Sequence, residues 1–146
     1  MVGFQVQMQG RSTFLYVVGN GDFLGAFFDT VALRLENGRR GKRFPVFNML
    51  YQGQVIDSTN LDALKKELSI VATELKKFSP QAVVWDMDDL SIKPPWGDNI
   101  SSEITDLANY FVTSQGYQLI VVFDKAIDHA ISLKTSLKIK STLEAT

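Results

Sequence analysis

The stretch "LDALKKELSIVATELKKFSP", residues 61–80, carries the clearest secondary-structure signal in the sequence. Its apolar residues recur every three or four positions, which predicts an amphipathic helix with one buried stripe. The stripe consists of Leu61, Leu64, Leu68, Val71, Leu75 and Phe78. Charged residues occupy most of the other positions, and Pro80 ends the element because proline cannot continue a helix. We therefore expect a helix over residues 61–78.

Toward the N-terminus, an alternating pattern predicts a β-hairpin. Phe4, Val6 and Met8 alternate with polar glutamines, as is typical of a half-buried strand. Residues 10–12 can turn the chain, and "TFLYVV", residues 13–18, has the composition of a second strand.

Two helices are expected between this hairpin and the helix at residues 61–78. The first follows Asp22, which we expect to cap it, and ends near Gly38. The second opens at Pro45 and runs to Tyr51, because proline is favoured in the first turn of a helix.

Toward the C-terminus, "AVVW" at residues 82–85 is a short apolar run and predicts a buried strand. Residues 107–114, "LANYFVTS", are predicted as another strand, with a helix beginning near Ser102 as the alternative. A last helix is expected from the apolar face of residues 119–130. The final strand, residues 137–140, alternates apolar residues with lysines, as edge strands do.

This order of elements predicts one α+β domain spanning residues 1–146. In it, a small, mostly antiparallel sheet packs against three to four helices. The sheet would combine the N-terminal hairpin with the later strands.

The composition excludes several classes of protein. The chain has 146 residues, is 45% hydrophobic and has a net charge of -1, which fits a globular domain rather than a nucleic-acid-binding protein. It has no cysteine, which excludes disulfides, thiolate metal sites and a cysteine nucleophile. No signal peptide and no apolar run of about 18 residues is present, so we expect a soluble, cytoplasmic protein.

The stretch "VVWDMDDLSIKPPWGDNIS", residues 83–101, is the candidate for function. Asp86 and Asp88 follow a predicted strand and have the type of ligand that Mg²⁺ prefers, so a metal-dependent phosphoryl-transfer enzyme is one alternative. No phosphate-binding loop, such as G-x-x-x-x-G-K-[ST], accompanies them. We therefore expect no catalytic residue, no metal and no cofactor.

Charge is distributed unevenly along the sequence. A basic loop, "GRRGKR" at residues 38–43, contrasts with residues 84–106, which hold six acidic residues and only one basic residue, Lys93. An acidic segment with a tryptophan in a loop is typical of a protein-binding surface, because carboxylates steer a basic partner and tryptophan anchors it. The predicted contact residues are Asp86, Asp88, Asp89, Trp96, Asp98, Asn99 and Glu103. Trp85 is expected in the core.

The same stretch, followed by "ITDLANYFVTSQG" at residues 104–116, resembles the immunity protein 70 family of bacterial polymorphic toxin systems. Three further blocks, "GDFLGAFF", "LYQG" and "ELKKFSP", stand in the same order as in that family.

The resemblance implies a non-enzymatic, cytoplasmic protein that binds the C-terminal domain of its cognate toxin, with no nucleic acid or membrane as partner. Many such toxins are nucleases with basic active surfaces, which an acidic segment would suit. A binding site on the basic loop, at Arg39, Arg40 and Arg43, and a general adaptor domain remain as alternatives.

Overall fold

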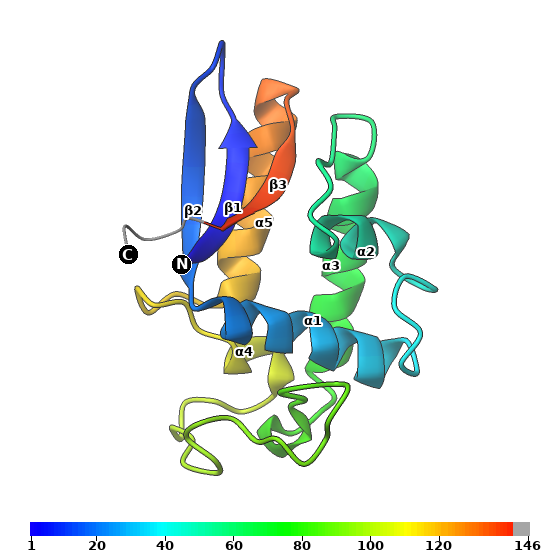
Figure 1. The fold of residues 1–146 in the computed structure, drawn as a ribbon, viewed down its shortest axis with the longest axis vertical. Helices are drawn as coiled ribbons and strands as arrows, with labels where there is room; N and C mark the ends of the chain where they lie inside the picture. The colour runs from blue at the N-terminus through cyan, green and yellow to red at the C-terminus, as the bar shows by residue number, and fades with distance from the viewer. Residues whose placement is uncertain (142–146) are drawn as a thin grey trace.

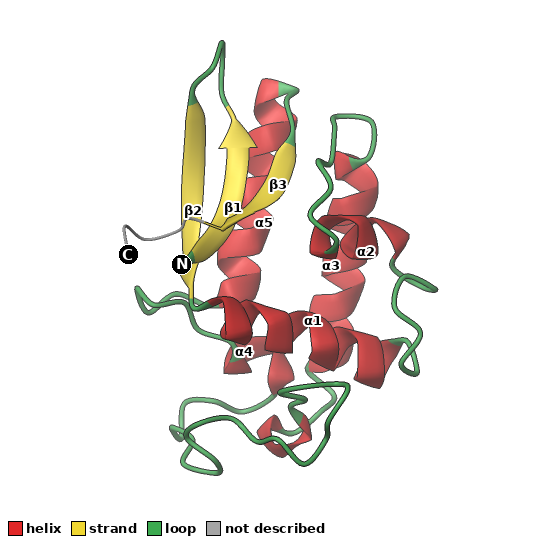
Figure 2. Cartoon of the chain, viewed as in Figure 1, coloured by secondary structure: helices red, strands yellow, loops and turns green. Residues whose placement is uncertain are grey.

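The computed structural model describes residues 1–141, which form a three-stranded sheet beside a group of helices (Figure 1). The strands are β1 (Val2–Gln7), β2 (Thr13–Gly19) and β3 (Leu137–Ser141). The helices are α1 (Gly21–Leu35), α2 (Pro45–Tyr51), α3 (Leu61–Leu75), α4 (Leu107–Tyr110) and α5 (Leu119–Leu133), with a 3-10 turn, η1 (Pro80–Ala82). Between η1 and α4 the chain is loop, at the end of the molecule opposite the β1–β2 turn (Figure 2). The predicted α+β fold is confirmed.

The sheet has the order β2-β1-β3, and both pairs of strands are antiparallel. This confirms the predicted hairpin and places β3 at an edge, as its lysines indicated. Phe4 and Val6 are fully buried on the face that packs against α5, and the ring of Phe4 stacks on that of Phe123 with 4.3 Å between centroids. Lys138 and Lys140 pair with Gln5 and Gly3 and therefore lie on the opposite face.

Helix α3 packs against α1, α2 and α5, which confirms the predicted stripe as part of the core. The residues of the stripe within the helix are almost completely buried: Leu61, Leu64, Leu68, Val71 and Leu75. The helix ends at Leu75 instead of residue 78, and Phe78 packs on the core from the turn that follows.

The ends of α1 were predicted with mixed success. Asn20, not Asp22, caps the helix: its side-chain oxygen accepts a hydrogen bond of 2.7 Å from the main-chain N–H of Asp22. The predicted end near Gly38 is confirmed, because its N–H donates to the carbonyl of Ala32 and its positive φ of 78° suits glycine.

Two predicted strands were wrong. Residues 82–85 contain the end of η1 and a loop, because side chains of α1 bond the main chain that a neighbouring strand would otherwise pair. Residues 107–114 begin with α4, since Asp106 starts a helix through a capping box with Asn109. The alternative helix was therefore right in kind, but it starts at Leu107 and not near Ser102.

Glu67 joins α3 to the start of α2. Its carboxylate is buried and accepts hydrogen bonds from the N–H groups of Val46 at 3.2 Å and Phe47 at 2.8 Å. Burial raises the pKa of Glu67, and the two donated hydrogen bonds oppose that shift. The side chain supplies acceptors for the N-terminus of a helix whose own cap, Phe44, provides none.

We expect Glu67→Ala to lower the free energy of unfolding by about 2 kcal/mol, because two buried N–H groups would lose their acceptor. Ser69→Ala, an exposed change on the same helix, is the matched control and should leave stability nearly unchanged. Urea denaturation followed by circular dichroism measures both. Equal stability of the two variants would contradict the role assigned to Glu67.

Candidate functional site

Side chains of α1 hold the start of the long loop. Thr30 is fully buried, and its hydroxyl donates to the carbonyl of Val84 at 3.1 Å while accepting from the N–H of Val84 at 3.0 Å. One turn further along the helix, Nε of Arg34 donates to the carbonyl of Ala82 at 2.8 Å. The main chain at the start of the loop is therefore bonded to side chains of a helix instead of to a sheet.

Asp29 continues this series and also contacts the basic loop. One carboxylate oxygen accepts from the N–H of Met87 at 2.9 Å, and the other pairs with the guanidinium of Arg40 at 2.7 Å. That guanidinium lies 3.9 Å from the centre of the Tyr51 ring, within range of a cation–π contact. The basic and acidic segments thus meet at one aspartate.

Arg43 of the basic loop is also engaged within the molecule. Its guanidinium bonds both carboxylate oxygens of Glu74, at 2.8 and 2.6 Å, and donates to the carbonyl of Leu35. The hydrogen bond from Arg43 holds the pKa of Glu74 below its ordinary value. Two of the three arginines of the alternative binding surface therefore have structural roles.

The acidic residues at the start of the loop shape its turns. A carboxylate oxygen of Asp86 accepts from the N–H of Asp88 at 2.9 Å. An oxygen of Asp89 accepts from both the N–H and the hydroxyl of Ser91, at 3.1 and 2.6 Å, and these bonds lower the pKa of Asp89. Asp88 and Asp89 are exposed, whereas Asp86 is partly buried.

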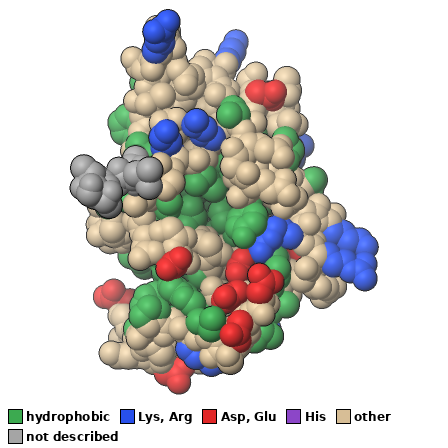
Figure 3. Space-filling view, in the orientation of Figure 1, with side chains coloured by type: hydrophobic (Ala, Val, Ile, Leu, Met, Phe, Trp, Pro, Cys, Tyr) green, Lys and Arg blue, Asp and Glu red, His purple; other side chains and the backbone are tan. Residues whose placement is uncertain are grey.

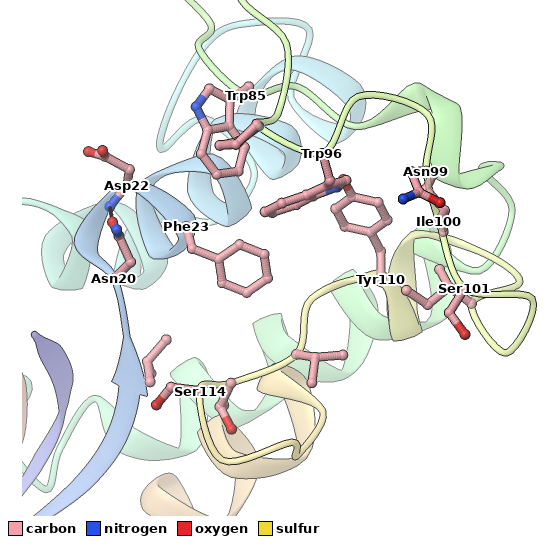
Figure 4. Close-up of a pocket in the computed structure, with 15 residues that line it drawn as sticks. Asn20, Asp22, Phe23, Trp85, Trp96, Asn99, Ile100, Ser101, Tyr110 and Ser114 are labelled. Atoms are coloured by element: carbon pink, nitrogen blue, oxygen red, sulfur yellow. Dashed lines mark hydrogen bonds between the residues drawn. The ribbon is translucent and has the colours of Figure 1, made fainter.

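A pocket of about 500 Å³ opens between this loop, the start of α1 and residues 110–114 (Figure 4). The rings of Phe23, Trp85, Trp96 and Tyr110 line one side of it (Figure 4). Trp85 and Trp96 meet edge to face, with 5.4 Å between ring centroids, and Phe23 lies 6.0 Å from Trp96. The remaining lining residues are Val18, Asn20, Asp22, Pro95, Asn99, Ile100, Ser101, Ile104, Val112, Thr113 and Ser114.

Helix α4 fixes Trp96 through Tyr110. The indole N–H of Trp96 donates to the hydroxyl of Tyr110 at 2.8 Å, and burial raises the pKa of Tyr110. The cap of α4 in turn depends on Asp106, which accepts from the N–H groups of Ala108 and Asn109. Trp96 is held this way although its side chain remains 39% exposed.

The structure separates the predicted contact residues into two groups. Trp96 and Asn99 line the pocket, whereas the five predicted acidic residues lie outside its lining. Those five are Asp86, Asp88, Asp89, Asp98 and Glu103. Figure 3 shows acidic side chains together with hydrophobic ones over the lower part of this face, and basic side chains beside them. Trp85, expected in the core, is partly buried and lines the pocket.

Sequence reasoning missed the part of the pocket that comes from the N-terminal half. Asn20, Asp22 and Phe23 lie in "GNGDFLG", residues 19–25, where the glycines mark a break between strand and helix. That break brings Phe23 next to two tryptophans more than sixty residues away. Nothing in the spacing of the chain indicated this contact, because it depends on how α1 crosses below the sheet (Figure 1).

The arrangement suits binding by shape and charge. Within residues 1–141, no three His, Cys, Asp or Glu side chains are grouped as a metal site would require. In the same part of the chain, no helix is both long and apolar enough to span a membrane. The pocket offers aromatic surface with a few polar groups at its edge, as small binding sites commonly do.

A sequence model of the immunity protein 70 family matches residues 11–139, which is most of the chain. The chain belongs to this family. The match extends the resemblance seen from the sequence, which began near Gly21, back to the β1–β2 turn. No curated protein and no solved structure shows significant similarity to the chain. Membership of the family indicates an immunity protein, directed against a toxin.

We expect Thr30→Val to lower the free energy of unfolding by about 2 kcal/mol, because the buried N–H and carbonyl of Val84 would lose their partner. Thr73→Val, at an exposed position of α3, is the matched control. Urea denaturation followed by tryptophan fluorescence reports on both the fold and the loop. A Thr30→Val variant as stable as its control would show that Thr30 does not hold the loop.

Proposed function

We propose that this protein binds the C-terminal domain of a cognate bacterial toxin in the cytoplasm and blocks the surface that the toxin needs for its activity. The contact surface in this proposal is the loop of residues 83–106 together with the aromatic pocket. In this proposal the protein inhibits the toxin by binding to its active surface and performs no catalysis itself. Such a role belongs to contact-dependent, polymorphic toxin systems, in which the producing cell and its siblings must be protected.

The observation that carries the proposal is the aromatic pocket beside exposed carboxylates. Binding energy in protein interfaces concentrates on a few aromatic anchors in pockets, surrounded by polar contacts. Trp96 is partly exposed, and the hydrogen bond to Tyr110 already fixes the orientation of its indole ring. A partly exposed ring that is held in place loses little conformational entropy when a partner covers it.

The charge of the loop favours a basic partner. Residues 84–106 contain six acidic side chains against Lys93, so the surface around the pocket attracts cations. A nuclease toxin fits this preference, because an enzyme that binds the phosphate backbone presents a basic surface to it. Carboxylates placed on that surface would take the positions of phosphates.

The alternatives receive less support. The basic loop offers Arg39 and Lys42, since Arg40 and Arg43 are engaged by Asp29 and Glu74. A phosphoryl-transfer site on Asp86 and Asp88 has no support from a third acidic, histidine or cysteine side chain, since no such group of three is found within residues 1–141.

We expect Asp88→Lys combined with Asp89→Lys to weaken binding of the toxin domain by at least about tenfold, because two attractive charges would become repulsive. The partner for this measurement is the C-terminal domain of the toxin that we expect the gene immediately upstream to encode, with its active site inactivated. The control carries the same change in charge on exposed positions of α3 and α5, Asp62→Lys with Asp128→Lys. Calorimetric affinities that agree between the two double variants would refute the acidic surface.

Trp96→Ala tests the pocket separately from the charge. Removing a central aromatic anchor should cost about 2 kcal/mol of binding free energy or more. Ile70→Ala, at an exposed hydrophobic position of α3 outside this surface, is the control and should leave the affinity nearly unchanged. Both variants must keep the circular dichroism spectrum of the wild type. An unchanged affinity for Trp96→Ala would exclude the pocket from the interface.

A further inference from the structure

A second exposed surface lies along the outer edge of β2, away from the loop of residues 83–106. In the order β2-β1-β3, no other strand formed by residues 1–141 lies on the outer side of β2. The other edge, β3, carries Lys138 and Lys140, whereas "TFLYVVG" in β2 has no charged residue. Lysines on an edge strand oppose pairing with another strand, so β2 lacks a protection that β3 has.

The hydrogen bonds of β1 show how its main chain is directed. The N–H of Gln7 donates to the carbonyl of Ser136, on the side of β3, at 3.0 Å. The next residue, Met8, donates to the carbonyl of Ser12, on the side of β2, at 2.9 Å. Because the direction alternates along an antiparallel strand, the even-numbered residues of β1 direct their main-chain groups toward β2.

The direction in β2 follows from this pattern. Phe14 and Tyr16 stand opposite even-numbered residues of β1, so their main-chain groups point inward. The main-chain N–H and C=O groups of Thr13, Leu15 and Val17 then point away from β1, toward the outer side of the sheet. Within residues 1–141, no hydrogen bond from outside the sheet reaches the main chain of these three residues.

The open edge has a definite end. The N–H of Ser114 donates to the carbonyl of Val18 at 2.9 Å, so the turn of residues 112–117 covers the edge there. The open part therefore runs over residues 13–17, and its centre is Leu15.

A groove of about 430 Å³ runs beside this edge, between β2, the turn at residues 115–117 and α5. Three large hydrophobic side chains around it are unusually exposed: Phe14 at 47%, Tyr117 at 61% and Val121 at 44%. An added strand would place alternate side chains into this groove and cover these residues.

We infer that β2 pairs with β2 of a second copy of the chain, antiparallel and about a two-fold axis at Leu15. In that register, Thr13 stands opposite Val17 of the second copy, so the three outward-facing residues pair with one another. Phe14 stands opposite Tyr16 of the second copy, and the exposed ring of Phe14 enters the groove of the other copy, while Tyr16 stays bonded to His129 of its own chain.

A second copy fits this edge for two reasons. The positions of the outward-facing groups, 13, 15 and 17, are symmetric about the centre, as a two-fold interface requires. The strand carries no charge, so two identical edges meet without like charges opposite each other. The pairing would join two three-stranded sheets into one of six strands.

Sedimentation equilibrium of the purified protein tests the inference, over concentrations from about 1 to 200 µM because association depends on concentration. We expect the wild type to dimerise in this range. Phe14→Lys, which would place a charge opposite Tyr16 of the second copy, should raise the dissociation constant by about tenfold or more. Leu15→Pro should do the same, because its outward N–H is not used in the β1–β2 ladder. Val55→Lys, at an exposed position outside the groove, is the control and should dimerise as the wild type does.

Hydrogen exchange of the wild-type protein gives a readout that does not depend on any variant. The amides of Thr13, Leu15 and Val17 should be protected at high concentration and exchange faster on dilution. A wild type that stays monomeric, a dimer that persists in folded Phe14→Lys and Leu15→Pro, or fast exchange of these amides at every concentration would each overturn the inference.

Discussion

The structure depends on the hydrogen bonds between α1 and the segment that follows η1. Thr30 is fully buried and both donates a hydrogen bond to Val84 and accepts one from it. Arg34 bonds the main chain before Val84, at Ala82, and Asp29 bonds it after Val84, at Met87. Buried main-chain groups need partners, and here three side chains of one helix supply what a neighbouring strand would supply in a sheet. This lets an apolar segment leave the core without joining the sheet, and the loop after it starts from a fixed position.

The pocket follows from that fixed start. Trp85 comes directly after the bonded segment, and Phe23 comes from the first turn of the same helix that holds it. The far end of the loop is held separately, by the capping box of Asp106 and by the hydrogen bond between Trp96 and Tyr110. A loop fixed at both ends can keep exposed aromatic and acidic side chains in place without packing them into the core.

Hydrophobic periodicity correctly predicted the elements that pack against the core along their whole length. The stripe of α3, the alternation of β1 and the lysines of β3 were all read correctly from the sequence, because each reflects one element facing one core. The failures at residues 82–85 and 107–114 have a different cause. At residues 82–85, the composition of an apolar run does not show whether a strand or the side chains of a helix will form hydrogen bonds with its main chain. At residues 107–110, the formation of a four-residue helix depends on a single capping residue, Asp106. Of the residues that line the pocket, the sequence singled out Trp96 and Asn99 as predicted contacts but not Phe23, because the contact of Phe23 with the two tryptophans arises only in the fold.

The turn of residues 112–117 connects the two exposed surfaces. Val112, Thr113 and Ser114 line the aromatic pocket, while Gln115 and Tyr117 line the groove beside β2. The turn is tied to the sheet through Ser114 and Val18, and closed on itself by the hydrogen bond from the N–H of Thr113 to the carbonyl of Tyr117 at 2.7 Å. A strand added to β2 would pack against one side of this turn, and a toxin in the pocket would contact the other. The pocket and the groove therefore share no lining residue, yet the hydrogen-bonded turn of residues 112–117 forms part of both.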